Sequence, residues 1–542
     1  MCAALPVAAA QLMACSMPDG SMQVQIASHA DPGCASVALP LDARQVDTVL
    51  PVPAGMLASS SLLVTSKPEA ADGERRTIMS AGSGDGAGTG SMPPVLPMES
   101  ELLSRMRLQI FGAEERVRAT LKDGQLRMTC RPGARPAGVI LSDDGVMPLA
   151  DLVLALRLQG RGRFELLAAD ADLAQREAGT RIGWIDALGE GQSVWQVALP
   201  MQGWDRSRWR HFSIACGTDG GELNLSSFCL MPDRSRPAPA RAAWQWDAAE
   251  WRQDPDSLLR RARGQGMRAL FVSVPVTDGA VADAPALARF IRAAARDGIA
   301  VWSVDGDPRM VMPAEQPKAV ARAKAYASYN ARNPGARLAG MQFDVEPYLL
   351  PAYALAEADW DARYLALVRA LAAAGQGTGS AGGKGLPLEM VVPYWWHGKQ
   401  ALLRDLAPHV ASLNVMDYRT RHDEIYGFAA PFLDWGQRFG KQVRIALEAG
   451  RVAPERHERY AKAERGDIWL VGAGSHAVLL HLGEALPNPS GPSFAKTGEW
   501  LADGSATSFH QDAEGLMRLL PELESQFSAW SSFGGMAVHG LD

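Results

Sequence analysis

The chain has 542 residues, a formal net charge of −6 and 47% hydrophobic residues. Acidic and basic residues are dispersed along it, which excludes the basic patch that binds nucleic acid or an anionic membrane surface. No apolar run reaches the roughly 18 residues of a membrane-spanning helix, so no transmembrane segment is expected. The length allows about three domains, one of which could be a barrel of about 250 residues.

The cysteines all precede residue 230, and their spacing matches no zinc or thiol-redox motif. Cys216 and Cys229 flank an expected hairpin and could pair in an oxidising compartment, although reduced, buried cysteines are an equal alternative. Residues 1–22 are small and apolar but lack the basic stretch of a secretory signal. Residues 12–15 loosely resemble a lipoprotein cleavage box. We therefore expect a secreted, periplasmic or lipid-anchored envelope protein.

The first 232 residues divide at a flexible linker. Residues 1–96 carry short strand-like runs and end in a Gly/Ser-rich stretch, which predicts a partly irregular segment. Over residues 97–232, short alternating segments broken by Gly, Asp and Asn predict an all-β, jelly-roll-like sandwich. Its closing pattern, Trp-Arg-His-Phe-Ser-Ile at 209–214, loosely resembles a carbohydrate-binding jelly roll. A purely structural accessory domain is the alternative.

Strand and helix signals alternate from residue 243 to 542. This pattern predicts a (β/α)8 TIM barrel after the sandwich. A doubly wound open sheet is the alternative, but no Gly-rich phosphate loop follows an early strand. An insertion at about 449–510 would shape the substrate site or be a packing excursion. The eight expected strands are 243–247, 269–276, 299–306, 338–346, 388–396, 410–418, 443–448 and 535–541.

Two acids close the expected fourth strand. Side chains alternate across a strand, so Asp344 and Glu346 share one face while Phe343 and Val345 point to the other. When two carboxylates lie this close together, the pKa of at least one of them is raised. That acid can stay protonated near neutrality and act as a general acid. A solvated acidic strand end is the ordinary alternative. In a barrel, however, these strand ends form the mouth where catalysis takes place.

Aromatic and polar residues are expected at the same rim. Apolar sugar faces stack on aromatic rings, and cleavage of a glycosidic bond needs acids and bases nearby. Each aromatic residue alone could equally be an ordinary core cap. The scattered histidines lack ligand spacing, so neither a metal nor another cofactor is expected. The candidate substrate-binding residues are Trp246, Trp302, Tyr348, Tyr394, Trp395, Trp396, Asn414, Met416 and His539.

Three strand-end motifs over residues 243–542 resemble glycoside hydrolase family 18, the chitinase and endo-N-acetylglucosaminidase family. Asp-Val-Glu at 344–346, Asn-Val-Met-Asp-Tyr at 414–418 and Gly-Gly-Met-Ala-Val-His at 534–539 are similar to its fourth-, sixth- and eighth-strand motifs. The resemblance implies that Glu346 protonates the leaving oxygen and that Asp344 orients the substrate's N-acetyl group. It also implies that Tyr418 supports the attacking carbonyl oxygen.

The chain departs from the family pattern at four positions. Ala339 and Gln342 occupy two aspartate positions of the fourth-strand motif. Arg419 replaces an aspartate after the sixth strand, and His539 stands where the family has tryptophan. The resemblance therefore implies a divergent relative rather than a chitinase.

A second mechanism would use Glu346 as acid/base and Glu448, at the end of the seventh strand, as nucleophile. Glu346-Pro347 is similar to the Asn-Glu-Pro of the large retaining glycosidase clan, although Val345 precedes the glutamate. Glu448 could alternatively pair with a nearby arginine. The resulting hypothesis is a retaining glycoside hydrolase acting on a poly- or oligosaccharide such as a bacterial exopolysaccharide. The alternative is a barrel that binds glycan without cleaving it.

Overall fold

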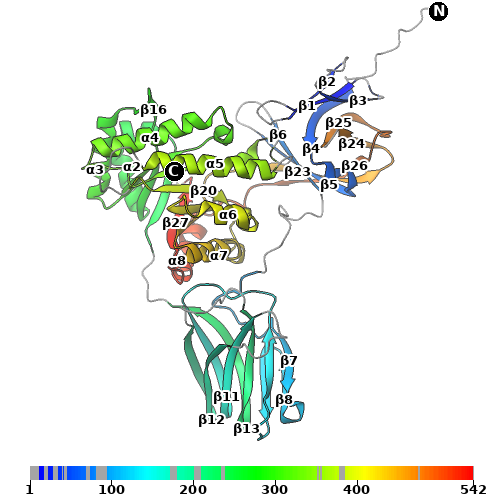
Figure 1. Cartoon of the computed structure of the whole chain (residues 1–542), viewed down its shortest axis with the longest axis vertical. Helices are drawn as coiled ribbons and strands as arrows, with labels where there is room; N and C mark the ends of the chain where they lie inside the picture. Colours follow the sequence, from blue (N-terminus) through cyan, green and yellow to red (C-terminus); the bar gives the residue numbers. More distant parts are fainter. Residues whose placement is uncertain are drawn as a thin grey trace, which may run out of the picture.

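The structure is a computed structural model, and it shows three strand-rich units (Figure 1). One is a closed barrel, one is a bent antiparallel sheet below it in the view, and one combines the N-terminal strands with a late insertion. The residues that the structure describes are 11–16, 22–27, 34–39, 41, 45–68, 74–80, 94–170, 180–199, 209–233, 239–350, 353, 357–376, 385–473 and 476–540.

Eight parallel strands close the barrel, and their spatial order follows the chain. Their carboxyl ends therefore meet at one rim. Alternation assigns the faces: Met341 and Phe343 are buried toward the helices, whereas Gln342 between them points into the barrel. The barrel strands are β14 (Arg241–Gln245), β15 (Met267–Ser273), β18 (Ala300–Asp305), β19 (Met341–Phe343), β20 (Leu388–Pro393), β21 (Ser412–Met416), β22 (Gln442–Glu448) and β27 (Phe533–His539).

The helices lie between the barrel strands in the chain and begin and end at recognisable residues. Asp247 and Asp254 cap two of them by accepting backbone N–H groups, and Pro255 occupies a first-turn position where no N–H is needed. Gly440 ends another with a φ of 64°. The helices are α1 (Ala248–Gln253), α2 (Pro255–Gly264), α3 (Ala284–Arg296), α4 (Gln316–Arg332), α5 (Glu357–Gly375), α6 (Gln400–Leu406), α7 (His422–Phe439) and α8 (Ala513–Phe527).

The second unit is a seven-stranded antiparallel sheet with long, bent strands. Pairing between β11 and its neighbours shifts at Gly160, Gly162 and Gly221, which all have positive φ. Only glycine adopts these angles readily, so the long strands can bend there and enclose an apolar core. The strands are β7 (Arg107–Gly112), β8 (Val117–Lys122), β9 (Gln125–Cys130), β10 (Ala137–Ser142), β11 (Leu152–Asp170), β12 (Thr180–Leu199) and β13 (Trp209–Pro232).

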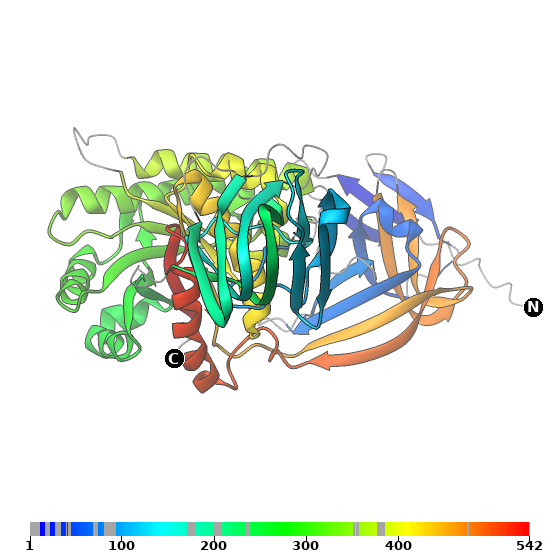
Figure 2. The same ribbon diagram turned by 90° about the horizontal axis from the view of Figure 1, so that it is seen from below.

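This bent sheet lies below the barrel in Figure 1 and in front of it in the view from below (Figure 2), and hydrogen bonds join the two units. The Asp434 carboxylate of α7 accepts hydrogen bonds from the Leu149 backbone N–H and the Trp530 indole N–H, both at 2.7 Å. The Tyr426 hydroxyl donates to the Leu96 carbonyl at 2.8 Å. Because these donors and acceptors are buried and mutually satisfied, they fix the sheet against α7 and the end of α8.

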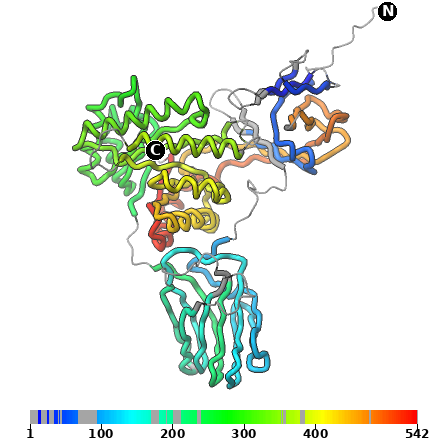
Figure 3. Tube along the Cα trace, in the orientation of Figure 1, coloured from blue at the N-terminus to red at the C-terminus, as the bar shows by residue number. Residues whose placement is uncertain are grey.

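The third unit joins segments from the two ends of the chain. The chain leaves the barrel after β22, forms four strands and returns to α8 (Figure 3). Those strands pair with N-terminal strands in the order β4-β25-β24-β26-β23-β5-β6, and a small sheet, β2-β1-β3, lies beside them. The strands are β1 (Gln11–Ser16), β2 (Met22–Ala27), β3 (Ala35–Ala38), β4 (Val46–Val52), β5 (Ser61–Pro68), β6 (Glu74–Ser80), β23 (Glu455–Ala463), β24 (Gly466–Ala473), β25 (His476–Leu486) and β26 (Ser493–Ala502).

The disulfides differ from the pairing that the sequence suggested. Cys216 pairs with Cys130 rather than with Cys229, and Cys15 pairs with Cys34. Cys229 forms no disulfide among the described residues. The bend in β13 explains the difference, because residues 221–225 beyond it pair with β9 and bring Cys130 close to Cys216.

The predicted fold class, a jelly-roll-like all-β sandwich followed by a (β/α)8 TIM barrel, is wrong. The described part of the chain is mostly strand, with 27 strands and eight α-helices. The closed ring is an eight-stranded parallel β-barrel that stands beside several other sheets, not a helix-rich TIM barrel. The main reason is long-range pairing: residues expected to be partly irregular complete a sheet with the insertion, as in the contact between Thr65 and His457, 392 positions apart.

Candidate active site

The two acids of the fourth barrel strand lie at the barrel mouth. Asp344 directly follows β19, and its backbone N–H donates to the Asp305 carbonyl at 2.9 Å, which extends the strand pairing. Val345 is buried against the helices, so Asp344 and Glu346 take the opposite side. A Cβ added at Gly306 would overlap the Asp344 carbonyl, so only glycine allows this close approach.

The surroundings of Asp344 favour its protonated form. Its Oδ1 is buried and has no hydrogen-bond partner among the described residues. Burial, reinforced by the charge of Glu346, raises the pKa of Asp344 well above its usual range. The Asp344–Glu346 pair thus keeps a proton at a pH where isolated carboxyl groups have lost theirs.

Two tyrosines complete the surroundings of this acid pair. The Tyr348 hydroxyl donates a hydrogen bond to Glu346 Oε2. Burial and the Glu346 charge raise the pKa of Tyr348, so it stays a phenol. Burial likewise raises the pKa of Tyr418, which lies beyond β21, and the charges of Glu448, Asp344 and Glu346 raise it further. Two strand ends, those of β19 and β22, thus bring three acids around the phenol that follows β21.

Glu448 is oriented from both sides at the end of β22. Its Oε1 accepts from the Gly450 backbone N–H at 2.6 Å, and its Oε2 lies 2.7 Å from His539 Nδ1. The Trp246 indole N–H points at His539 Nε2 at 3.2 Å. An indole N–H can only donate, so Nε2 must accept, and the proton of a neutral His539 must sit on Nδ1 and be donated to Glu448. Trp246 and His539 therefore hold Glu448 in place.

This chain of hydrogen bonds predicts a single neutral tautomer for His539. We expect ¹⁵N shifts of labelled histidine to place the proton on Nδ1 in the wild type, and Trp246→Phe to give a mixture of tautomers because the indole donor is lost. Trp395→Phe is the control, since Trp395 is similarly exposed but packs against Tyr348 rather than bonding to His539. An unchanged tautomer in Trp246→Phe would contradict the assignment.

A polar network forms the floor beneath the mouth. Glu389, fully buried, accepts from Gln342 Nε2 at 2.7 Å and from the Ser412 hydroxyl at 2.6 Å, and it pairs with Arg444 at 3.4 Å. Gln342 Oε1 accepts from the Trp244 indole at 2.6 Å. If a carboxylate replaced Gln342, Glu389 would lose the hydrogen bond from the amide and face a second negative charge. An amide is therefore the better partner for Glu389 in this buried network.

Sequence reasoning missed Glu389 and Trp244. The signal for Glu389 was a lone acid inside the apolar run Leu-Glu-Met-Val-Val-Pro of β20. Arg444, one possible partner of Glu448, is instead committed to Glu389 and to the Gly534 carbonyl at 2.7 Å. Asn414 belongs to the same floor, with its Nδ2 3.4 Å from Glu389 and its side chain fully buried.

The aromatic candidates separate into exposed and buried groups. Trp246 and Trp395 are 40% and 37% exposed, so their rings remain accessible. Tyr348 packs edge-on against Trp395, with ring centres 5.0 Å apart. Trp396 is fully buried against α5, and Tyr394 is buried with its hydroxyl bound to Arg419. Met416 is also buried, which leaves the first two tryptophans as the accessible platforms.

Trp302 packs inside the barrel over Gly340. A Cβ added at Gly340 would overlap the indole ring, so Gly340→Ala is expected to lower the free energy of unfolding by about 1–3 kcal/mol. Gly335→Ala in the same loop meets nothing within 4 Å and should change it by less than about 0.5 kcal/mol. Urea unfolding measures both, and equal stability of the two variants would contradict the packing argument.

The base of the insertion borders the mouth. The Ser508 hydroxyl donates to the Gly450 carbonyl at 2.6 Å, and the Phe509 N–H donates to the Glu448 carbonyl at 2.9 Å. Thr420, two residues beyond Tyr418, donates to the Ser505 carbonyl at 3.0 Å. The segment that returns from β26 thus lies directly beside two of the candidate catalytic residues.

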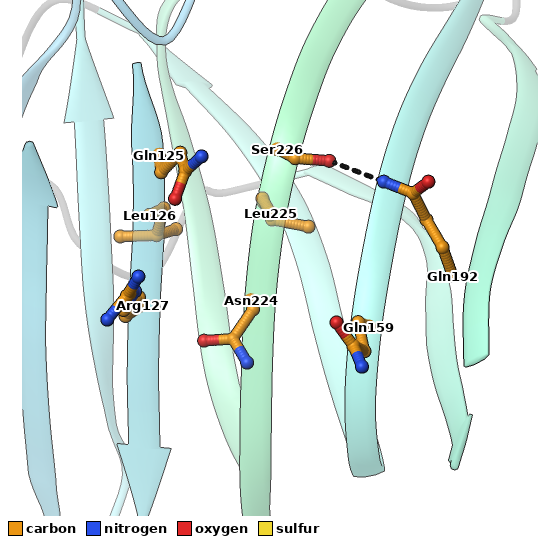
Figure 4. Close-up of a pocket in the computed structure, with 8 residues that line it drawn as sticks. All are labelled: Gln125, Leu126, Arg127, Gln159, Gln192, Asn224, Leu225 and Ser226. Atoms are coloured by element: carbon orange, nitrogen blue, oxygen red, sulfur yellow. Dashed lines mark hydrogen bonds between the residues drawn. The ribbon is translucent and has the colours of Figure 1, made fainter. Parts of the chain in front are cut away.

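A separate pocket of about 350 Å³ lies on the bent sheet (Figure 4). Its wall is mainly uncharged and polar, and the Gln192 amide donates to the Ser226 hydroxyl at 3.1 Å. Such side chains can both donate to and accept from hydroxyl groups. The lining residues are Gln125, Leu126, Arg127, Gln159, Gln192, Asn224, Leu225 and Ser226.

Within the described residues, no three His, Cys, Asp or Glu side chains are grouped so that they could hold a metal ion. None of the helices described there has the length and apolar character needed to span a membrane.

No family model matches the chain. No curated protein matches it either. Solved structures that match include family 29 carbohydrate-binding modules. A mutant complexed with mannohexaose is 10% identical over 23% of this chain and 80% of its own, with a TM-score of 0.19. Another, complexed with cellulohexaose, is 8% identical over the same shares, with a TM-score of 0.18. A likeness this weak supports no argument about this chain.

Proposed function

We propose that this chain is a glycoside hydrolase in which Glu346 is the general acid. The observation that carries the proposal is the pair of carboxyl groups at the mouth, where burial, reinforced by the charge of Glu346, raises the pKa of Asp344 well above its usual range. A general acid needs a proton to give to the leaving oxygen, and in this proposal the proton that the Asp344–Glu346 pair retains passes to Glu346 for that step. Trp246 and Trp395 offer exposed rings for sugar stacking at the same rim.

Substrate-assisted retention, of the kind implied by the resemblance to family 18, is the mechanism that we favour. Asp344 would donate a hydrogen bond to the substrate's N-acetyl group, and the Tyr418 phenol would support the carbonyl oxygen that attacks the anomeric carbon. Glu346 would protonate the leaving oxygen and then activate water. The raised pKa of Tyr418 supports this arrangement, because a phenol among three acids stays a donor.

Glu448 as an enzyme nucleophile is the alternative mechanism. Both of its oxygens already accept hydrogen bonds, which suits an orienting acid but does not prevent attack. The two mechanisms differ in their substrates, because assistance requires an N-acetyl group on the cleaved sugar. A polymer and its de-N-acetylated form would therefore distinguish them: cleavage of both favours Glu448 as nucleophile.

The test of the function is release of reducing ends from a panel of bacterial and N-acetylated polysaccharides. We expect the wild-type chain to release them from at least one polymer. The other class of function, glycan binding without cleavage, is favoured by the loss of a motif acid at Gln342, whose amide is occupied in the barrel floor. Saccharide binding with no turnover over long incubation would overturn the hydrolase proposal.

We also propose that the protein acts in an oxidising compartment outside the cytoplasm. Two disulfides, Cys15–Cys34 and Cys130–Cys216, support this location because such bonds persist mainly in exported proteins. Fractionation of the native host, with the redox state of the four cysteines measured by alkylation, tests it. Fully reduced cysteines in the cytoplasmic fraction would contradict it.

A further inference from the structure

A second pocket lies at the end of the barrel opposite the mouth. It has a volume of about 620 Å³ and is formed where α5, α6 and the segments leading into β21 and β22 meet. His409 precedes β21 and Lys441 precedes β22, so these residues lie at the amino ends of the barrel strands. Asp344 and Glu346 lie at the carboxyl ends. The pocket is therefore separate from the proposed active site.

The pocket concentrates positive charge. Arg369, Arg404, Lys441 and His409 line it, with Asp405 as the single acid among its lining residues. Asp405 is bound to Arg404 at 3.1 Å. Neither Arg369 nor Lys441 forms an ion pair with a carboxylate of the described residues. Positive charges gathered without a counter-charge repel one another, and a bound anion would offset this repulsion.

The unpaired cations are positioned by contacts within the fold. The Arg369 Nε–H donates to His409 Nε2 at 3.3 Å, and Lys441 Nζ donates to the Val410 carbonyl at 2.9 Å. These bonds leave the outer guanidinium N–H groups of Arg369 for a ligand. Burial lowers the pKa of His409, and the positive charges of Arg369 and Lys441 lower it further. Phe439, 36% exposed, supplies an apolar wall.

We propose that this pocket binds an oxyanion, with Arg369 and Lys441 as its main ligands and Arg404 at the rim. Guanidinium and ammonium groups are the side chains that proteins use for phosphate and carboxylate groups, and Arg369 presents two N–H donors in a planar fork. The Phe439 wall would contact the carbon part of an organic anion. This inference does not depend on the proposed hydrolase activity.

The test is titration of the full-length chain with inorganic phosphate at constant ionic strength. We expect a saturable rise in melting temperature and an upward movement of the His409 pKa, followed by its ring proton NMR signal, because an anion stabilises the imidazolium form. The double variant Arg369→Gln/Lys441→Gln should bind phosphate at least about tenfold more weakly. Arg118→Gln/Lys122→Gln on β8 removes the same charge from a distant, exposed strand and should bind normally.

Phenyl phosphate separates two sources of the oxyanion. Tighter binding than inorganic phosphate supports an organic ligand that uses the Phe439 wall, whereas equal binding supports the free anion at the same site. The proposal is overturned if phosphate gives no saturable shift, or if chloride at matched ionic strength has the same effect. It is also overturned if the double variant binds phosphate as tightly as the wild type.

Discussion

Replacing Glu346 by Gln should lower kcat on any polymer that the wild type cleaves by about 10²–10⁴-fold, the usual contribution of general acid catalysis. The amide cannot give a proton to the leaving oxygen, but it can still accept the hydrogen bond from Tyr348. Folding should therefore be unaffected, and KM should change little. Initial rates of reducing-end release, with circular dichroism as the check on folding, measure the effect.

The matched control for this substitution is Glu514→Gln. Glu514 lies in the first turn of α8 with its side chain 94% exposed, so the same chemical change there removes no contact with the mouth. We expect this control to retain full activity. If Glu346→Gln also kept full activity, Glu346 would have no part in the mechanism, and the hydrolase proposal would lose its general acid.

Replacing Asp344 by Asn should raise stability at neutral pH while lowering activity. The pKa of Asp344 is raised in the folded chain by burial and by Glu346, whereas in the unfolded chain it lies near 4. Below about pH 4, Asp344 is protonated in both the folded and the unfolded chain, so it does not lower the free energy of unfolding. As the pH rises from there through the folded-state pKa, the wild type loses about 1.4 kcal/mol for each unit by which that pKa is raised. Asn cannot ionise, so the variant avoids this loss.

Urea unfolding between about pH 4 and pH 8 measures the pH dependence of this effect. We expect the wild type and Asp344→Asn to have similar stability at the acid end and to diverge as the pH rises. Asp219→Asn, in an exposed turn of β13, is the control and should follow the wild type at every pH. Parallel curves for Asp344→Asn and the wild type would contradict a raised pKa at Asp344.

The activity of Asp344→Asn carries the second half of this prediction. Asn can donate to an N-acetyl carbonyl but cannot share a proton with Glu346, so kcat should fall while stability rises. Opposite changes in stability and activity are expected where a strained group is kept for function. A variant that was more stable and fully active would place Asp344 outside the mechanism.

Local patterns were informative wherever neighbouring residues decide the outcome. Each of the eight strand ranges expected from the sequence overlaps a barrel strand. The alternation that sends Phe343 and Val345 toward the helices was also visible, because a strand has a period of two residues. The fold class predicted from those strands was nevertheless wrong, since the units outside the barrel contribute most of the strands.

Contacts between distant segments could not be predicted in the same way. For Glu448, the sequence suggested an arginine partner as the alternative to a catalytic role, whereas its hydrogen-bond partners are Gly450 and His539. Asn414 had the spacing of a rim residue, but the depth of the barrel places it against Glu389. Both outcomes depend on which strands become neighbours when the barrel closes.

The sequence by itself determined the positions of the barrel strands, the shared face of Asp344 and Glu346, and the dispersed charge, because these depend on local spacing and composition. Only the tertiary structure decided the Cys130–Cys216 disulfide, the Trp246–His539–Glu448 hydrogen bonds and the sheet that joins β5 to β23. Each of these unites residues from 86 to 400 positions apart. No local pattern encodes such pairs, since their energy appears only when the whole chain has folded.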